Sequence, residues 1–311
     1  GAYDILQKGM EFCPDSDEIK QLSEQAENLI NYTQKVKEGN DLNTAANYEE
    51  AIKKYEEAMQ IDSTQEAAYA GAVQCYLIQN KIKEAQDLLQ SDSAKSLPEK
   101  SMKRLRSACH MQYIYNLLSQ EDYMAIREYM VNNQGELLYG FYQKGKYDND
   151  CNNLDLTSPM LKLTSPSNSN AVYVHYGTYA SNRRRSGNGK TVWFSLSTAE
   201  NYYYADGEWS GITLSSGNAF KQIFITDTNE DNWIFTYSGN IENDSFHGDI
   251  NITWQKPDGS QYDSATVHAE HGTLDCLWEE GGKYVYAQGS SGWYWSSSTM
   301  DGLKGYTYRI Q

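Results

Sequence analysis

The spacing of apolar residues along the first part of the chain predicts α-helices. Between residues 45 and 61, apolar side chains recur every three or four positions, which places them on one face of a helix. The same pattern returns 34 positions later, so that Ala85 is equivalent to Ala51. A further pair of helices is expected near 99–131. Its apolar ridge consists of Tyr123, Ile126 and Met130.

A period of 34 residues is that of the tetratricopeptide repeat, and residues 45–90 resemble this family. Small residues let the two helices of a repeat approach closely; these are Ala51, Ala58, Gly71, Ala72 and Ala85. The opening segment resembles the second helix of an earlier repeat, so tetratricopeptide-like helices are expected over about 2–131. The residues that exceed one period predict a long helix near 16–38 and a loop at Gly39-Asn40-Asp41.

The tetratricopeptide resemblance implies a concave face that often holds a peptide, and therefore a protein or peptide partner. The alternative is an array that serves only as a spacer.

From residue 171 onward the apolar period changes from helical to two, which predicts β-strands. Val172, Val174 and Tyr176 share one face of such a strand, and 250–254 alternates in the same way. Turns between strands are expected at three glycine-containing signals. They are Asp206-Gly207, Pro257-Asp258-Gly259 and Asp301-Gly302.

A longer repeat underlies the alternation. Its first glycines are Gly177, Gly207, Gly239 and Gly272, and its second glycines are Gly187, Gly217, Gly248 and Gly282. The aromatic residues that follow are Trp193, Phe224, Trp254 and Tyr286. The order of glycine, apolar residue, glycine and aromatic residue over about 170–290 resembles MORN repeats. That resemblance implies stacked β-hairpins that serve as interaction or assembly modules, in which glycine provides positive φ.

Composition changes near residue 134. The first 134 residues contain 4 of the 23 glycines and none of the 7 tryptophans, which suits helices before this point and hairpins after it. The sequence therefore predicts a multidomain α plus β protein. Its domains are a tetratricopeptide-like array at 1–134 and an antiparallel β-hairpin repeat sheet at 135–311.

The formal net charge of -16 argues against nucleic acid and anionic membrane surfaces as main partners. The five cysteines are widely spaced and odd in number, so neither a disulfide framework nor a thiolate metal site is expected. Gly1 resembles a residue left by expression cloning, and we expect the natural chain to continue before Ala2.

No arrangement of residues predicts catalysis or a cofactor. Gly189-Lys190-Thr191 resembles the end of a phosphate-binding loop, but Arg184 replaces the required first glycine and a strand follows. His268 and His271 point to opposite faces of a strand, so they cannot share a metal ion. We therefore expect no enzyme. The alternative is a carbohydrate-binding or carbohydrate-active protein that uses aromatic residues of the β half.

Two groups of residues are candidates for binding. Arg183, Arg184 and Arg185, joined by Lys190, could dock an anionic group, and the alternative is a solvated loop tip. Trp293 and Trp295 share one face of a strand and could stack on a sugar or peptide, unless they cap the last repeat.

Together these features favour a non-catalytic binding or scaffold protein of the bacterial cell envelope, with glycan as a second possible partner. We expect an extracellular or envelope location, with membrane contact only through a segment before Ala2. A cytoplasmic location stays open.

Overall fold

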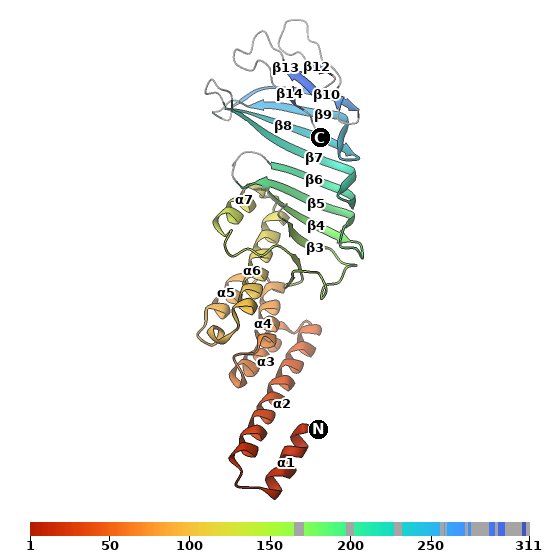
Figure 1. Cartoon of the computed structure of the whole chain (residues 1–311). Coiled ribbons are helices and arrows are strands. Elements are labelled where there is room, and N and C mark those ends of the chain that lie inside the picture. The colour runs from red at the N-terminus through yellow and green to blue at the C-terminus, as the bar shows by residue number, and fades with distance from the viewer. Residues whose placement is uncertain are drawn as a thin grey trace. The chain divides into compact units, whose positions relative to one another are not determined.

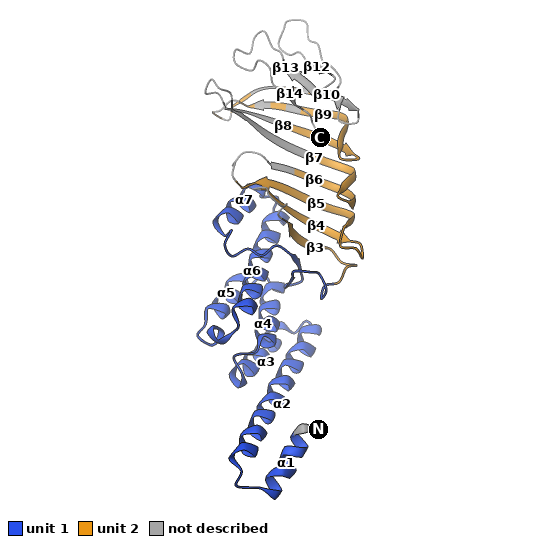
Figure 2. Cartoon of the chain, viewed as in Figure 1, with its two compact units in different colours: residues 1–154 blue, residues 155–311 orange. Residues whose placement is uncertain are grey.

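The computed structural model divides the chain into two compact units, residues 1–154 and residues 155–311 (Figure 2). Each is described by itself. The residues that the structure describes are 1–164, 171–196, 202–226, 232–255, 258, 260–270, 273–274, 286–289, 292–295 and 307–308.

Unit 1 begins with seven α-helices and one short 3-10 helix (Figure 1). They are α1 (Ala2–Phe12), α2 (Asp17–Thr44), α3 (Tyr48–Ile61), α4 (Glu66–Ile78), α5 (Ile82–Gln90), η1 (Ser93–Ser96), α6 (Glu99–Ser119) and α7 (Tyr123–Asn132). Each helix from α2 to α7 packs against the next α-helix in the sequence. The predicted helix pairs are thus confirmed.

The small positions of the repeat lie where helices meet. Ala51, Ala58, Ala72 and Ala85 are completely buried, as the 34-residue period predicts. The predicted loop at Gly39-Asn40-Asp41 is wrong, because α2 continues through these residues to Thr44. Gly39 is buried inside the helix and lies against the Tyr55 ring, so packing in the folded protein overrides the tendency of glycine to interrupt helices.

A β-hairpin follows the helices within unit 1. It consists of β1 (Phe141–Gln143) and β2 (Lys146–Asp148), joined by Lys144 at φ 48° and Gly145 at φ 82°. Two consecutive residues with positive φ are what a two-residue hairpin turn requires. The hairpin contacts α6, so the helical unit extends to Leu154, whereas the composition change had suggested a boundary at 134.

Unit 2 contains a sheet in which nine strands follow one another in sequence order, each antiparallel to the next. They are β3 (Met160–Thr164), β4 (Ala171–Tyr179), β5 (Arg185–Ser195), β6 (Tyr202–Gly211), β7 (Thr213–Thr226), β8 (Asn232–Glu242), β9 (Ser245–Gln255), β10 (Gln261–Glu270) and β11 (Thr273–Leu274). A separate group contains β12 (Tyr286–Gly289), β13 (Gly292–Trp295) and β14 (Thr307–Tyr308). The predicted α plus β fold class is confirmed.

One predicted turn is wrong, because Asp206 and Gly207 lie inside β6. Gly207 belongs to a row of glycines that face one another across β4 to β7. The His175 ring covers part of this row: a Cβ at Gly177 or at Gly189 would lie 2.8 Å from an atom of that ring. These two glycines therefore make room for a buried side chain, which local sequence does not reveal.

The second glycines of the repeat occupy equivalent bulges. In β5, residues 186–188 face one residue of β4, and in β9, residues 247–249 face one residue of β8. Gly187 at φ 72° and Gly248 at φ 80° lie within these bulges. Gly272 and Gly282 lie outside the described residues, as do Asp301 and Gly302.

Candidate functional site

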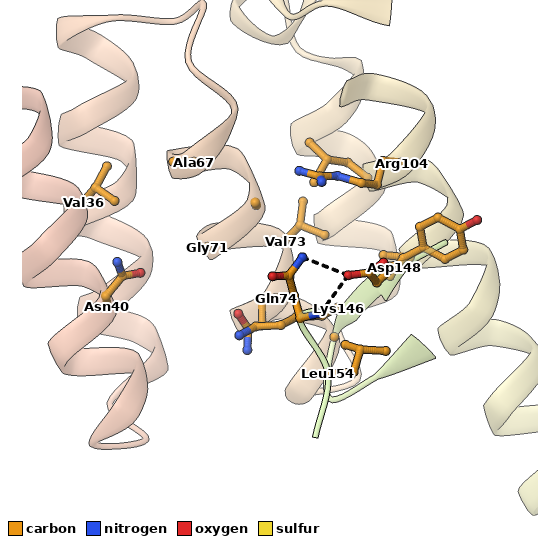
Figure 3. A pocket seen from close by; sticks show the side chains of 16 residues that line it. Val36, Asn40, Ala67, Gly71, Val73, Gln74, Arg104, Lys146, Asp148 and Leu154 are labelled. Carbon is orange, nitrogen blue, oxygen red and sulfur yellow. Dashed lines mark hydrogen bonds between the residues drawn. The ribbon is translucent and has the colours of Figure 1, made fainter. Parts of the chain in front are cut away.

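A groove in unit 1 is lined by three helices and the hairpin (Figure 3). It encloses a cavity of about 330 Å³, which lies at the lower end of the range for ligand sites. Small side chains of α4 create the hollow, because Ala67, Ala70 and Gly71 leave space that larger residues would fill. The hairpin contributes Gly145, and a Cβ there would lie 2.8 Å from the carbonyl oxygen of Gln74.

The helices contribute equivalent positions to the groove. Val36 of α2, Ala70 of α4 and Arg104 of α6 are each 34 residues apart, and all three line the cavity. The same holds for Asn40, Gln74 and Ala108. Repetition of these positions shows that α2, α4 and α6 are corresponding helices of successive repeats, and that one face of the array forms the groove.

Polar groups at the groove are mostly hydrogen-bond donors. Asn40 accepts a hydrogen bond from the Tyr55 hydroxyl at 2.8 Å through Oδ1, which leaves its Nδ2 group as a donor. Arg104 pairs with Glu66, whose second oxygen accepts a bond from Ser101 at 2.6 Å. Lys146 is exposed and has no ion-pair partner among the described residues.

The carboxylate of the groove is held by its own segment. Asp148 accepts bonds from the Asp150 amide at 2.9 Å, and from the Asn153 amide and side chain at 3.0 Å and 2.9 Å (Figure 3). Burial would raise the pKa of Asp148, but these hydrogen bonds outweigh it and hold the pKa below its usual value. Asp148 is therefore a structural anion, and the cations remain for a ligand.

The structure separates the arginines that the sequence grouped. Arg183 and Arg184 are exposed in the turn between β4 and β5, where Arg183 adopts φ 64°. Arg185 instead lies in β5, with its guanidinium 4.6 Å from the centre of the Trp209 ring. Lys190 lies on the other face of the same strand, 3.8 Å from the carboxylate of Asp206. These four residues do not form one cluster.

Beside Arg185, unit 2 buries a polar pair. The Nδ1 atom of His175 lies 2.6 Å from the Thr191 hydroxyl, and the imidazole meets the Trp209 ring edge-on. Burial lowers the pKa of His175 to about 3, and the positive charges of Arg185 and Lys162 add to this effect. The imidazole is therefore neutral at physiological pH, and this cluster packs the sheet.

The second candidate pair, Trp293 and Trp295, lies in β13, whose backbone pairs with β12 and β14. Their side chains lie outside what the structure describes. Among the described residues, no group of three or more histidine, cysteine or acidic residues could hold a metal ion. No described helix is long and apolar enough to cross a membrane.

The groove residues are not among the binding candidates that the sequence suggested. A signal was present nonetheless, since Asn40, Gln74 and Ala108 follow the same 34-residue period that identifies the repeat. The period had been assigned from α3 and α5, whereas the groove is formed by α2, α4 and α6.

The fold and the groove place unit 1 among helical repeat proteins. The family model of the tetratricopeptide repeat matches residues 42–109, which include α3, α4, α5 and most of α6. The match supports the tetratricopeptide part of the sequence-based interpretation. No curated protein and no solved structure is similar enough to this chain to count as a match.

Proposed function

We propose that this protein is a non-catalytic interaction module that binds an extended segment of a partner protein in the groove of unit 1. The observation that carries the proposal is the convergence of equivalent positions from α2, α4 and α6 on one cavity. The tetratricopeptide match supports it, because such repeats generally bind protein or peptide partners.

The groove favours a partner segment with a small apolar residue and an acidic group. Val36, Val73 and Leu105 supply apolar surface around the cavity. Arg104 and Lys146 supply positive charge, in a protein whose net charge is -16. Since the overall charge repels acidic segments, a locally cationic rim selects them only at this position.

Selection from a random peptide library displayed on phage tests the proposal, with the full chain as bait. Ala70→Trp fills the cavity and should weaken binding of the selected peptides by about tenfold or more. Lys83→Trp is the matched control, because it adds the same ring at an exposed position of α5. If no peptide distinguishes the wild type from Ala70→Trp, the groove is not the binding site.

The charge preference has its own test. Lys146→Gln should weaken binding of acidic selected peptides, and added salt should reduce the difference from wild type. Lys83→Gln removes the same charge outside the groove and should have no effect. Selected peptides without acidic residues would contradict the preference for acid, but would leave the peptide-binding groove intact.

We also propose that unit 2 is a MORN-like hairpin repeat used for assembly. The recurrence of Gly187 and Gly248 in equivalent bulges supports this proposal. An experimental structure of residues 272–286 in which no such hairpin follows would count against it. The exposed Arg183 and Arg184 are proposed as an anion-docking point, which Arg183→Ser with Arg184→Ser would weaken in a salt-dependent manner.

A location in the bacterial cell envelope remains part of the proposal. Its support is the richness of the sheet unit in tyrosine, asparagine, serine and glycine, which suits an exposed surface. Fractionation of cells that produce the natural protein tests it, and recovery in the cytoplasmic fraction alone would reject it.

A further inference from the structure

A second cavity of unit 1 lies between α5, α6 and the turn after α7, away from the groove. Its volume is about 300 Å³. Its lining consists of Gln86, Leu89, Gln90, Arg106, Cys109, His110 and Glu136. None of these residues lines the groove, so the proposed peptide site does not account for the second cavity.

A buried imidazole points into this cavity. The His110 side chain is only 9% exposed, and its Nδ1 atom lies 2.7 Å from the Tyr129 hydroxyl. Burial lowers the pKa of His110, and the charge of Arg106 adds to this effect, so the imidazole is neutral at pH 7. Burial also raises the pKa of Tyr129, which therefore keeps its proton and can donate it to Nδ1.

The remaining nitrogen of His110 is thus a donor. Its Nε2 atom lies 3.5 Å from Oε2 of Glu136, and a carboxylate oxygen can only accept. With Nδ1 as the acceptor for Tyr129, the hydrogen resides on Nε2 and faces Glu136. The distance is long for a hydrogen bond, so this buried donor is incompletely satisfied.

A cation stands beside this donor. Arg106 precedes His110 by four residues on α6, which places the two side chains on the same face of the helix. Arg106 also lines the cavity, and no carboxylate within ion-pair distance of it is found among the described residues. Gln86 and Gln90, one turn apart on α5, add amide groups on the opposite wall.

Glu136 shows which chemistry suits the site. Its carboxylate lies next to the buried donor while its side chain is 59% exposed, so it can move away into solvent. A ligand carboxylate in its place could bond to Nε2 of His110 and form a charge-assisted pair with Arg106. We propose that this cavity binds the carboxylate of a small organic acid, with His110 and Arg106 as donors and Glu136 as the group that it displaces.

Titration of the full chain, with isotopically labelled histidine, by succinate at constant ionic strength tests the proposal. The NMR signal of His110 should shift and saturate, with a dissociation constant in the millimolar range or tighter. Sodium chloride at the same ionic strength is the control and should cause no saturable shift. A shift that never saturates, or one that chloride reproduces, would overturn the proposal.

Three variants separate the roles of the residues. Arg106→Gln is an exposed substitution that should weaken succinate binding by about tenfold. Arg183→Gln removes an exposed cation from unit 2 and should leave the affinity unchanged. Glu136→Gln should tighten binding about threefold, because it removes the competing carboxylate. Equal affinity of the wild type and Glu136→Gln would contradict displacement, and tighter binding of inorganic phosphate than of succinate would contradict the assignment to carboxylates.

Discussion

Gly71 of α4 lies directly against the ring of Tyr55, so closely that a Cβ at position 71 would be 2.3 Å from the Cζ atom. The tyrosine is completely buried, and the same ring also faces Gly39 of α2. A large side chain of α3 therefore fits between two helices only because each has a glycine at the contact.

Gly71→Ala should destabilise unit 1, although alanine favours helix more than glycine does. The added methyl group must displace a buried aromatic ring, which costs about 1–3 kcal/mol in free energy of unfolding. Urea unfolding followed by circular dichroism at 222 nm measures this change, since unit 1 contains the helices.

Gly9→Ala is the matched control for this substitution. A Cβ at position 9 of α1 would make only ordinary contacts of 3.6 Å with Ile19, so alanine should stabilise by about 0.5–1 kcal/mol. Changes of the same sign in both variants would show that the packing around Tyr55 is not the deciding effect.

Ala85→Leu should overpack the contact that the repeat places there. Ala85 of α5 is completely buried, so a leucine side chain should cost about 1–3 kcal/mol. Lys83→Leu introduces the same side chain at an exposed position of the same helix and should change stability little. Equal denaturation midpoints for the two variants would contradict the repeat assignment.

Unit 2 should lose stability as the pH falls below about 6.5. An unfolded histidine has a pKa near 6.5, whereas burial lowers the pKa of His175 to about 3 in the folded protein. Between these values the unfolded state binds a proton that the folded state excludes. The free energy of unfolding then falls by up to about 1.4 kcal/mol per pH unit.

Tryptophan fluorescence measures this effect in unit 2 alone, because all seven tryptophans follow residue 154. Urea unfolding at pH 7.5 and at pH 5 should show a larger loss for wild type than for His175→Gln, which has no imidazole to protonate. A pH dependence that is identical in the two proteins would exclude His175 as its source.

Limited proteolysis should release a helical fragment that ends after the hairpin, and not near residue 134. Tyr142 and Tyr147 are buried within unit 1, and the Tyr142 hydroxyl bonds to Gln112 of α6, so cleavage before them is slow. Mass spectrometry of the earliest stable fragment gives its end. An end between 132 and 140 would show that the hairpin does not belong to the helical unit.

Sequence alone determined the helical and β character of the two parts, because periodicity reports which face of each element is buried. Apolar residues at helical spacing placed Ala51 and Ala85 in equivalent buried positions, and alternation placed Val172 and Val174 on a strand. These features depend on neighbours within a few residues, which local sequence contains.

Only the tertiary structure decided where chain breaks fall and which residues form a site. Gly39 and Gly207 look like interruptions locally, yet the Tyr55 ring and a facing strand keep them inside regular elements. Arg184 and Arg185 adjoin in sequence, but one is exposed in a turn and the other stacks on Trp209. Arg106, His110 and Glu136 meet only because the chain returns to α6 after α7. Contacts between distant segments fix these outcomes, and no local pattern records which segments will meet.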